Sequence, residues 1–313
     1  MIAVNQNPRT LMEAMRHFDI ETAEKFIAGI KWPEGPCCPK CGSINVGAIP
    51  SRRRFQCREK GCRRQFSLTT NTILEATHLR ADQWVIAIWL IVNSKNGISS
   101  CEMARTLGCK QQSAWHLLHR VRHVIAAEHS EQLRGVVESD ETFVGGLQKF
   151  MSMSRRIKAR AKLNGGKAVV HGLKERASGK VRAEVIPAAT TEYIRDAVLE
   201  NVEEGSILCT DESHVYKWAR APYYHHRTVN HADRYVNGIA HTNGLECFFN
   251  CLRRGLKGTY IRATPDHLTA YVDEQVYRFN HRKLTDWERF EGAMRMIVGK
   301  RLTYSALTDG AVR

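Results

Sequence analysis

The sequence lacks any apolar run long enough to cross a membrane. Its longest, WVIAIWLIV from Trp84 to Val92, falls far short of the ~20 residues that a membrane-spanning helix needs. The N-terminal residues also lack a basic start followed by an apolar stretch and a cleavage site, so we expect no secretion signal. No membrane partner is therefore expected. The missing sorting signals favour a bacterial cytoplasm, with a nuclear location as the alternative.

Acidic residues are scarce relative to basic ones. The 313-residue chain has 32 Asp and Glu against 47 Lys and Arg, which gives a net charge of +15 and a pI near 9.5. Such an excess indicates a polyanionic partner, either nucleic acid or an anionic membrane surface. A basic soluble enzyme without such a partner is the alternative. The length suits about two domains, and the hydrophobic content of 43% is enough for a sizeable core.

Four of the ten cysteines stand in two short pairs. Cys38 and Cys41 form a C-x2-C knuckle, and Cys57 and Cys62 follow with a C-x4-C spacing. In a chain without an export signal, this pattern predicts one structural Zn2+ held by four thiolates. Cys37 is a spare thiol beside Cys38, so the register could shift. Four unrelated buried thiols are the alternative interpretation.

The predicted zinc ribbon spans residues 36–72 and is strongly basic. From Pro36 to Ser67 it holds eight Lys or Arg and one acid. A closed four-cysteine site leaves no coordination position for catalysis, so we interpret the ribbon as a module that binds nucleic acid. A solvated charged face is the alternative. The candidate DNA contacts in the ribbon are Arg52, Arg53 and Arg54.

Residues 78–130 have the pattern of a helix-turn-helix. Asp82 is expected to cap a buried helix, Ser99 or Ser100 to start a second, and Gly108 to make the turn before a third. This order is typical of DNA-reading modules, although a plain packing hairpin gives the same pattern. The predicted contacts on the third helix are Lys110, Gln111, Gln112 and Ser113 in a groove, and His119, Arg120 and Arg122 at phosphates.

Three carboxylates lie at the ends of predicted elements. VESDETFVGG places Asp140 near the end of a short strand, and ILCTDESHVY ends another strand at Asp211. Glu246 lies near the start of the helix in TNGLECFFNCLRRGLKG. Because side chains alternate across a strand, Glu138 shares a face with Asp140 and Glu141 does not. Surface acids at strand ends are common, and they are the alternative interpretation.

The order of elements indicates how these acids meet. Three strands, a helix, a strand, a loop and further helices fit a mixed α/β, or α+β, arrangement like a ribonuclease H core over residues 135–285. There the first and fourth strands are neighbours, so Asp140 meets Asp211, and the later helix brings Glu246. Three converging carboxylates repel one another unless a cation lies between them. Their oxygens select Mg2+ or Mn2+, and two such ions suit phosphoryl transfer.

With these motifs in this order and spacing, nearly the whole chain resembles the DDE-type insertion-sequence transposases with an N-terminal zinc ribbon, the family numbered fifteen ninety-five. The segments that carry the resemblance are CPKCGS with CREKGCRRQFSLTTNTIL, VESDETFVGG, ILCTDESHVY, and HTNGLECFFNCLRRGLKGTY followed by HLTAYVDEQVYRFNHRK. The resemblance implies Mg2+-dependent strand cleavage and joining, with Asp140, Asp211 and Glu246 as the catalytic, metal-binding triad. Asn71, where the family usually has Gly, and the C-x4-C spacing are small departures.

The resemblance also implies a basic residue seven positions after Glu246, which is Arg253 here. His241 and Asn243 belong to the same motif and are expected to support the site or contact DNA. We add Arg254 and Lys257 as candidate DNA contacts. Residues 148–167 hold seven Lys or Arg and no acid. We interpret them as a loop that holds DNA phosphates, with a solvated linker as the alternative.

The leading hypothesis is a transposase that binds the terminal inverted repeats of its own element through the ribbon and the helix-turn-helix. Two alternatives stay open: a DNA-binding regulator without chemistry, and a ribonuclease H-fold nuclease or resolvase that cuts but does not join. Bringing two ends of double-stranded DNA together implies a homodimer or a larger assembly. Residues 1–35 are expected to form a helical segment, and residues 286–313 a C-terminal tail or helix.

Overall fold

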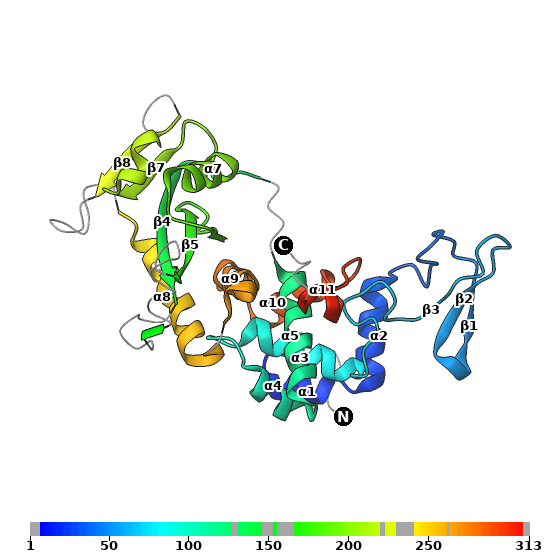
Figure 1. Cartoon of the computed structure of the whole chain (residues 1–313). Helices are drawn as coiled ribbons and strands as arrows, with labels where there is room; N and C mark the ends of the chain where they lie inside the picture. Colours follow the sequence, from blue (N-terminus) through cyan, green and yellow to red (C-terminus); the bar gives the residue numbers. More distant parts are fainter. Residues whose placement is uncertain are drawn as a thin grey trace. The chain divides into compact units, whose positions relative to one another are not determined.

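The computed structural model describes residues 7–126, 131–145, 153–154, 166–219, 223–229, 241–261 and 263–308 (Figure 1). The chain divides into two compact units, Met1–Ile125 with His281–Arg313, and Ala126–Asn280. Within the described ranges, no helix is long and apolar enough to cross a membrane. Apart from residues 153–154 and 166–167, the basic segment 148–167 lies outside the described residues.

The first unit begins with two helices and a small antiparallel sheet. The helices are α1 (Leu11–His17) and α2 (Ile20–Lys31), and the sheet has the order β1 (Val46–Ile49), β2 (Arg54–Cys57) and β3 (Gln65–Phe66), with the 3-10 turn η1 (Pro50–Arg52) between the first two strands. Trp32 packs edge-on against Phe55 and Phe66, which stack on each other. Such a small apolar cluster is too little core to fold alone, which is the usual reason for a structural metal.

Three further helices follow the ribbon, namely α3 (Ala81–Asn93), α4 (Ser100–Leu107) and α5 (Gln111–Ile125). Ser99 caps α4 by accepting the Glu102 N–H at 3.2 Å. Gly108 ends α4 with φ of 65°, which suits a residue without a Cβ. The predicted cap of α3 is wrong: Asp82 lies in the first turn, and the Gln83 side chain accepts the Arg80 N–H instead.

The C-terminal residues return to the first unit. Helix α10 (Asp286–Arg295) places Phe290 against Phe18, Phe26 and Trp89, and α11 (Tyr304–Thr308) follows. The aromatic core of the N-terminal helices therefore includes Phe290 of the segment that was predicted as a C-terminal tail or helix.

The second unit contains a five-stranded sheet with the order β6-β5-β4-β7-β8. Strand β4 pairs antiparallel with β5, which pairs antiparallel with β6, whereas β4–β7 and β7–β8 are parallel. The first and fourth strands of this unit are therefore neighbours, as the ribonuclease H-like arrangement predicts. The strands are β4 (Val136–Val144), β5 (Ala168–Glu175), β6 (Val181–Ile186), β7 (Ile207–Asp211) and β8 (His225–Val229).

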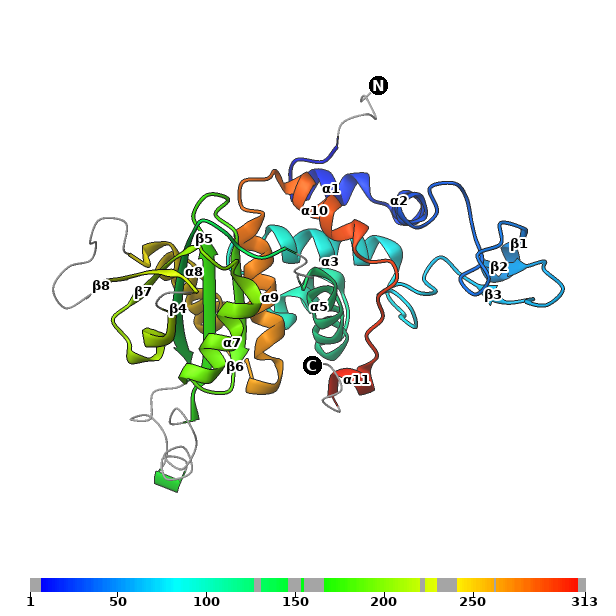
Figure 2. The same cartoon turned by 90° about the horizontal axis from the view of Figure 1, so that it is seen from above.

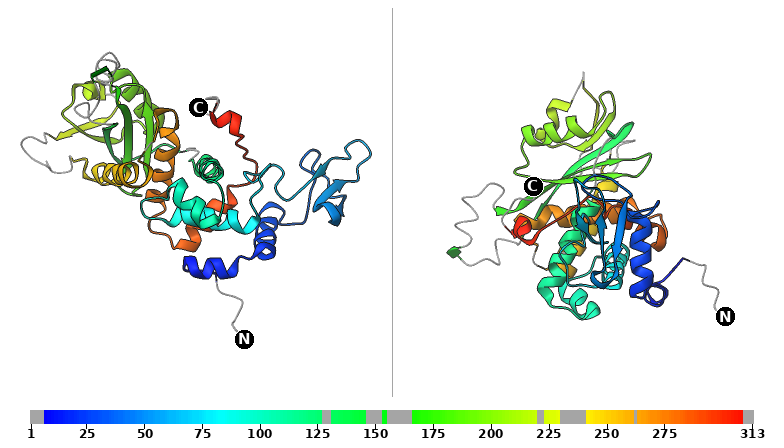
Figure 3. Two further views of the ribbon diagram at one scale, coloured as in Figure 1. Left: turned by 60° about the horizontal axis from the view of Figure 1, so that its bottom comes forward. Right: turned by 90° about the vertical axis from the view of Figure 1, so that its right-hand side faces the viewer.

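Helices cover both faces of this sheet (Figure 2). On one face, α7 (Thr191–Asn201) and the 3-10 turn η4 (His214–Ala219) pack on Val169 and Leu173. On the other face, α8 (Asn243–Arg254), the π-helical turn η5 (Gly255–Tyr260) and α9 (Pro265–Asn280) pack on Val170. Successive residues of β5 thus face two different cores, which is why the neighbours Val169 and Val170 are both buried. Figure 3 shows α8 and α9 along the sheet from a further side.

Candidate catalytic site and zinc centre

Strand β4 points its acids to both faces of the sheet. Glu141 Oε2 accepts a hydrogen bond from the Tyr216 hydroxyl at 2.7 Å, and Tyr216 lies in η4. Glu138 instead lies against α8, because its Oε2 accepts the Leu245 N–H at 3.0 Å. Asp140 has the same parity along the strand as Glu138 and therefore faces α8. These contacts agree with the prediction that Glu138 and Asp140 share one face of the strand and that Glu141 lies on the other.

Helix α8 runs along β4 and is tied to it at two points. The first is the Leu245–Glu138 hydrogen bond, and the second is a 3.3 Å hydrogen bond from Arg253 Nε to Thr142 Oγ1. Eight residues of helix rise ~12 Å and four residues of strand ~13 Å, so the two elements stay in step. Glu246, in the first turn of α8, is thereby held over the same stretch of strand as Asp140.

Strand β7 brings the third acid to the same face. The parallel pairing of β4 with β7 aligns Glu138 with Cys209. Continued by two residues, the same register aligns Asp140 with Asp211, the last residue of β7. Paired residues of neighbouring strands point to the same side, so Asp211 also faces α8.

The acids act on one another electrostatically. The pKa of Asp140 is raised to about 7, mainly by burial. The Glu141 N–H, which donates to Asp140 Oδ1 at 2.8 Å, opposes this effect, and the charges of Glu141, Asp211 and Glu246 add to it. Burial also raises the pKa of Glu141, and the charge of Asp211 adds to this effect. Such a site gains from a cation that compensates the crowded charge.

These carboxylates are a suitable donor set for hard divalent ions, but they are not gathered as tightly as the cysteines of the ribbon. Within the described residues, the four cysteines are the one group of three or more side chains placed to hold an ion as they stand.

A buried ion pair fixes the start of α8. Glu138 is 1% exposed and its Oε1 accepts from Arg176 Nε at 2.8 Å. Arg176 also donates from Nη2 to the His241 carbonyl at 2.7 Å. A Cβ on Gly244 would overlap Lys174 Nζ and lie 2.7 Å from Glu138 Oε2, which explains the glycine at this place. Sequence reasoning missed Arg176, because it follows a hairpin strand and belongs to none of the acidic motifs.

A second group of buried side chains is linked by hydrogen bonds on the other face of β4. Ser139 Oγ donates to the Tyr216 hydroxyl at 3.1 Å and lies 2.9 Å from His171 Nε2. Burial lowers the pKa of His171 to about 4, so this imidazole is neutral at physiological pH. The alternation of β4 could have identified Ser139 as inward-facing, but nothing in the sequence indicated its partners.

The other predicted residues of the third motif lie around α8. The His241 side chain has its Nδ1 at 3.5 Å from Glu138 Oε1, and Asn243 is the exposed first residue of α8. Arg253, Arg254 and Lys257 are all exposed. The structure therefore leaves these basic side chains accessible to a polyanion.

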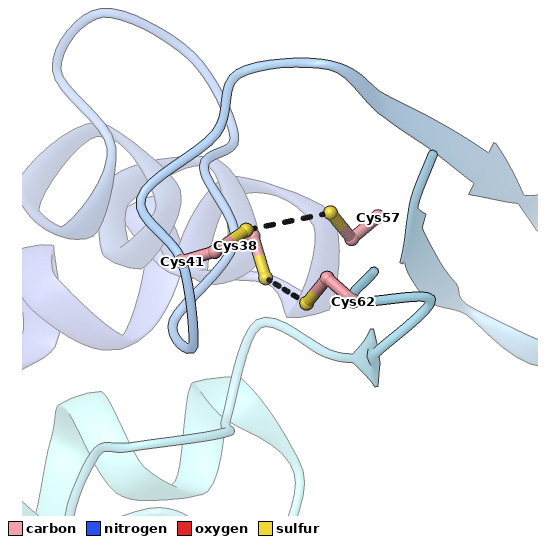
Figure 4. A group of neighbouring side chains, drawn as sticks. All are labelled: Cys38, Cys41, Cys57 and Cys62. Carbon is pink, nitrogen blue, oxygen red and sulfur yellow. Dashed lines mark hydrogen bonds between the residues drawn. The ribbon is translucent and has the colours of Figure 1, made fainter. Parts of the chain in front are cut away.

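The four predicted ribbon cysteines form one cluster, with their sulfur atoms within 4.8 Å of one another (Figure 4). Cys38 Sγ lies 3.6 Å from Cys62 Sγ, and Cys41 Sγ lies 3.6 Å from Cys57 Sγ. A zinc tetrahedron with bonds of about 2.3 Å has edges of about 3.8 Å, so the cluster fits Zn2+. Burial raises the pKa of Cys57 to about 12, so metal binding must displace a thiol proton there. Cys37 is not part of the cluster.

The predicted DNA contacts of the first unit divide into two groups. The exposed group is available to a ligand and consists of Arg52, Arg53, Arg54, Lys110, Gln111, Gln112 and Ser113. The second group is buried, and for it the prediction of phosphate contacts is wrong; it consists of His119, Arg120 and Arg122.

Arg120 has a structural partner in place of a phosphate. It is 6% exposed, and its guanidinium donates to the Leu302 carbonyl from Nε and to the Ile73 carbonyl from Nη1, both at 3.0 Å. Arg120 thus joins α5 to two segments that are distant in the sequence.

Comparison with known proteins is consistent with this geometry. The ISXO2-like transposase domain family matches residues 132–280, and the transposase zinc-ribbon domain family matches residues 19–65. A protein in the transposable element ISH50 of Halobacterium salinarum is 26% identical over 262 residues, which cover 80% of this chain and 87% of that protein.

Two solved structures have weaker similarity. A chain of the simian T-cell lymphotropic virus intasome, in complex with PP2A regulatory subunit B56 gamma, is 12% identical with a TM-score of 0.29, covering 56% of this chain and 63% of that one, just under two thirds. The HTLV-2 integrase catalytic core domain in complex with magnesium is 11% identical with a TM-score of 0.26, covering 46% of this chain and 86% of that one. These TM-scores are too low to assign a fold.

The two domain families together match well over half of the chain, in the order ribbon then transposase domain. They cover both the cysteine cluster and the three acids of β4, β7 and α8. The chain belongs to the insertion-sequence transposases with an N-terminal zinc ribbon, the family numbered fifteen ninety-five.

Proposed function

We propose that this transposase binds the terminal inverted repeats of its own element and catalyses metal-dependent strand cleavage and strand transfer. The observation that supports the proposal is that Asp140 and Asp211 face α8 from neighbouring strands, while Glu246 lies in the first turn of α8 and its charge acts on Asp140. A protein that only binds DNA has no need for converging carboxylates whose charges raise the pKa of one of them.

Asp140, Asp211 and Glu246 would hold two Mg2+ or Mn2+ ions, which supply Lewis-acid stabilisation of the attacking and leaving oxygens when bound. The chain's own residues orient the reaction. Asp140 must give up its proton before it can hold a cation, because its pKa is about 7. Arg253 lies two helical turns beyond Glu246 and presents its exposed guanidinium to the phosphates beside the cut.

The remaining basic residues would hold the DNA. In the second unit these are Arg254 and Lys257, which follow Glu246 in the chain. His241 and Asn243 lie at the start of α8 and would add to them. In the first unit, the ribbon, stabilised by one Zn2+ on the four-cysteine cluster, would present Arg52, Arg53 and Arg54 to phosphates, and Lys110, Gln111 and Gln112 would enter a groove. Joining two ends requires two active sites, so we expect a homodimer or a larger assembly on DNA.

The proposal is tested by incubating the protein with a duplex that carries the element's ends, taken from the DNA flanking its gene. Strand cleavage and joined products are expected with Mg2+ and not with EDTA, and a loss of about 10³-fold or more is expected for Asp211→Asn or Glu246→Gln. Retention of activity by all three triad variants, Asp140→Asn included, would refute the assigned site.

Product analysis separates the alternatives. Metal-dependent cutting without any joined product would indicate a nuclease or resolvase. Tight binding to the ends with no cutting under any metal would indicate a DNA-binding regulator.

A further inference from the structure

A pocket that the acidic site does not explain lies in the first unit, beside the start of α5. Its volume is about 420 Å³. One wall comes from the first turns of α5, and the other from the C-terminal segment that Arg120 holds against α5 through the Leu302 carbonyl. The side chains that line it include those of Gln112, Ser113, His116, Arg120, Arg301 and Tyr304.

The pocket is positively charged. Arg301 is 53% exposed, and its nearest acid, Glu75, lies 3.8 Å away and already accepts the Asn71 N–H at 2.8 Å. Burial and then the charge of Arg301 lower the pKa of Arg120, and the charge of Glu75 partly opposes them. Two guanidinium groups thus face a single carboxylate at this pocket. Two like charges at one concave site favour an anion between or beside them.

The polar groups of the pocket also suit an anion with several oxygens. His116 and Tyr304 line the pocket, and their rings meet edge-on at 5.4 Å. Gln112 and Ser113, in the exposed first turn of α5, supply further donors. A phosphate group accepts hydrogen bonds on each of its free oxygens and matches a planar guanidinium.

We propose that this pocket binds one phosphate of the DNA backbone, so that residues 297–304 form part of the DNA-binding surface together with the first turn of α5. The proposal rests on the proposed function only for the identity of the polyanion. It assigns a role to part of the C-terminal segment 286–313, which the sequence predicts only as a tail or helix. It also replaces Arg120 by Arg301 as the phosphate contact: Arg120 positions the segment, and Arg301 reaches the ligand.

The test compares full-length wild type, Arg301→Gln and Arg295→Gln in binding to a labelled duplex over a range of salt concentrations. Arg295 is the matched control, because it is an exposed arginine of the same unit that pairs with Glu291 on α10, outside the pocket. Arg301→Gln is expected to weaken binding about tenfold. It should also reduce the slope of log affinity against log salt by about 1, equally for element ends and unrelated duplexes.

Arg295→Gln is expected to match the wild type, and all three proteins should melt at the same temperature. An unchanged affinity and salt slope for Arg301→Gln, with wild type binding DNA, would overturn the inference. The inference would also be overturned if Arg301→Gln bound DNA like the wild type and lost only the increase in melting temperature that inorganic phosphate gives the wild type. The pocket would then be a site for free phosphate. A wild type that binds all duplexes equally contradicts end recognition, whereas the Arg301 effect would still stand.

Discussion

Asp273 in α9 is a carboxyl group whose pKa is set by burial. Burial raises its pKa to about 7, whereas an unfolded chain has a value of about 3.9. Between these two values the folded protein keeps a proton that the unfolded chain has lost. The free energy of unfolding therefore falls as pH rises from about 4 to 7, and the contribution of the protonated acid is fully present only below that range.

We expect Asp273→Asn to remove this pH dependence. Relative to wild type, the variant should gain on the order of 2 kcal/mol of stability at pH 8 and little at pH 4. Denaturant unfolding at the two pH values measures the difference. Asp196→Asn, at an exposed acid of α7, is the control and should follow wild type. Equal effects of Asp273→Asn at both pH values would contradict the assignment.

Arg120 provides a second prediction for a single residue. Replacing it by Met keeps much of the side-chain volume but leaves the carbonyls of Ile73 and Leu302 without their donor. Arg120→Met should therefore lower the free energy of unfolding by about 2–4 kcal/mol. Thermal melting measures this loss. Unaltered stability together with weakened DNA binding would restore Arg120 as a surface contact.

The sequence could not distinguish these two roles of Arg120. Helical spacing placed it after Leu118 and before Val121, both of which are core residues, and a basic side chain on such a helix is usually at the surface. Its hydrogen-bond partners are the carbonyls of Ile73 and Leu302, which are far from Arg120 in the sequence. A local sequence pattern does not predict such contacts. The orientation of the acids was easier to predict, because the alternation of side chains along a strand alone places Glu138 and Asp140 on one face.

At the scale of elements, the site depends on how α8 is held over β4. The buried pair of Glu138 and Arg176 joins the strand, the Leu245 N–H and the His241 carbonyl. This arrangement fixes the first turn of α8, which contains Glu246. Glu138 and Arg176 are therefore positioning residues rather than catalytic ones.

We expect Glu138→Gln to slow strand cleavage by about tenfold or more while DNA affinity stays within about twofold, because a shift of the first turn moves a metal ligand. It should also destabilise the unit, since Arg176 loses a buried partner. Combining it with Arg176→Gln should cost less than the sum of the single changes. The exposed Glu203→Gln is the control. Additive losses would show that the pair does not act as a unit.

The strands of the second unit could be predicted from short apolar runs bounded by turns, and the ribonuclease H-like order of elements predicted that the first and fourth strands are neighbours. The return of α10 to the N-terminal helices could not. Phe290 contacts Phe18, Phe26 and Trp89, which are about 200 or more residues away in the sequence. The pattern of an amphipathic helix does not specify which apolar surface the helix covers.

At the scale of the whole molecule, one metal supports the fold of the ribbon and others would serve the chemistry of the second unit. Cys41→Ser should abolish the tightly bound zinc, whereas Cys37→Ser should retain one Zn2+ per chain, because Cys37 is not in the cluster. Zinc content after gel filtration measures both. Zinc loss on changing Cys37 would show that the register of the ligands is shifted.

The most direct test of the central account replaces a proposed oxygen ligand by sulfur. Asp140→Cys is expected to be inactive in strand cleavage with Mg2+, which binds sulfur poorly, and to regain activity with the softer Mn2+. Glu141→Cys, on the opposite face of β4, should show no such change of metal preference. Rescue of Asp140→Cys by Mn2+ would confirm that Asp140 binds the catalytic metal. Equal activity of Asp140→Cys in the two metals, at whatever level, would contradict it.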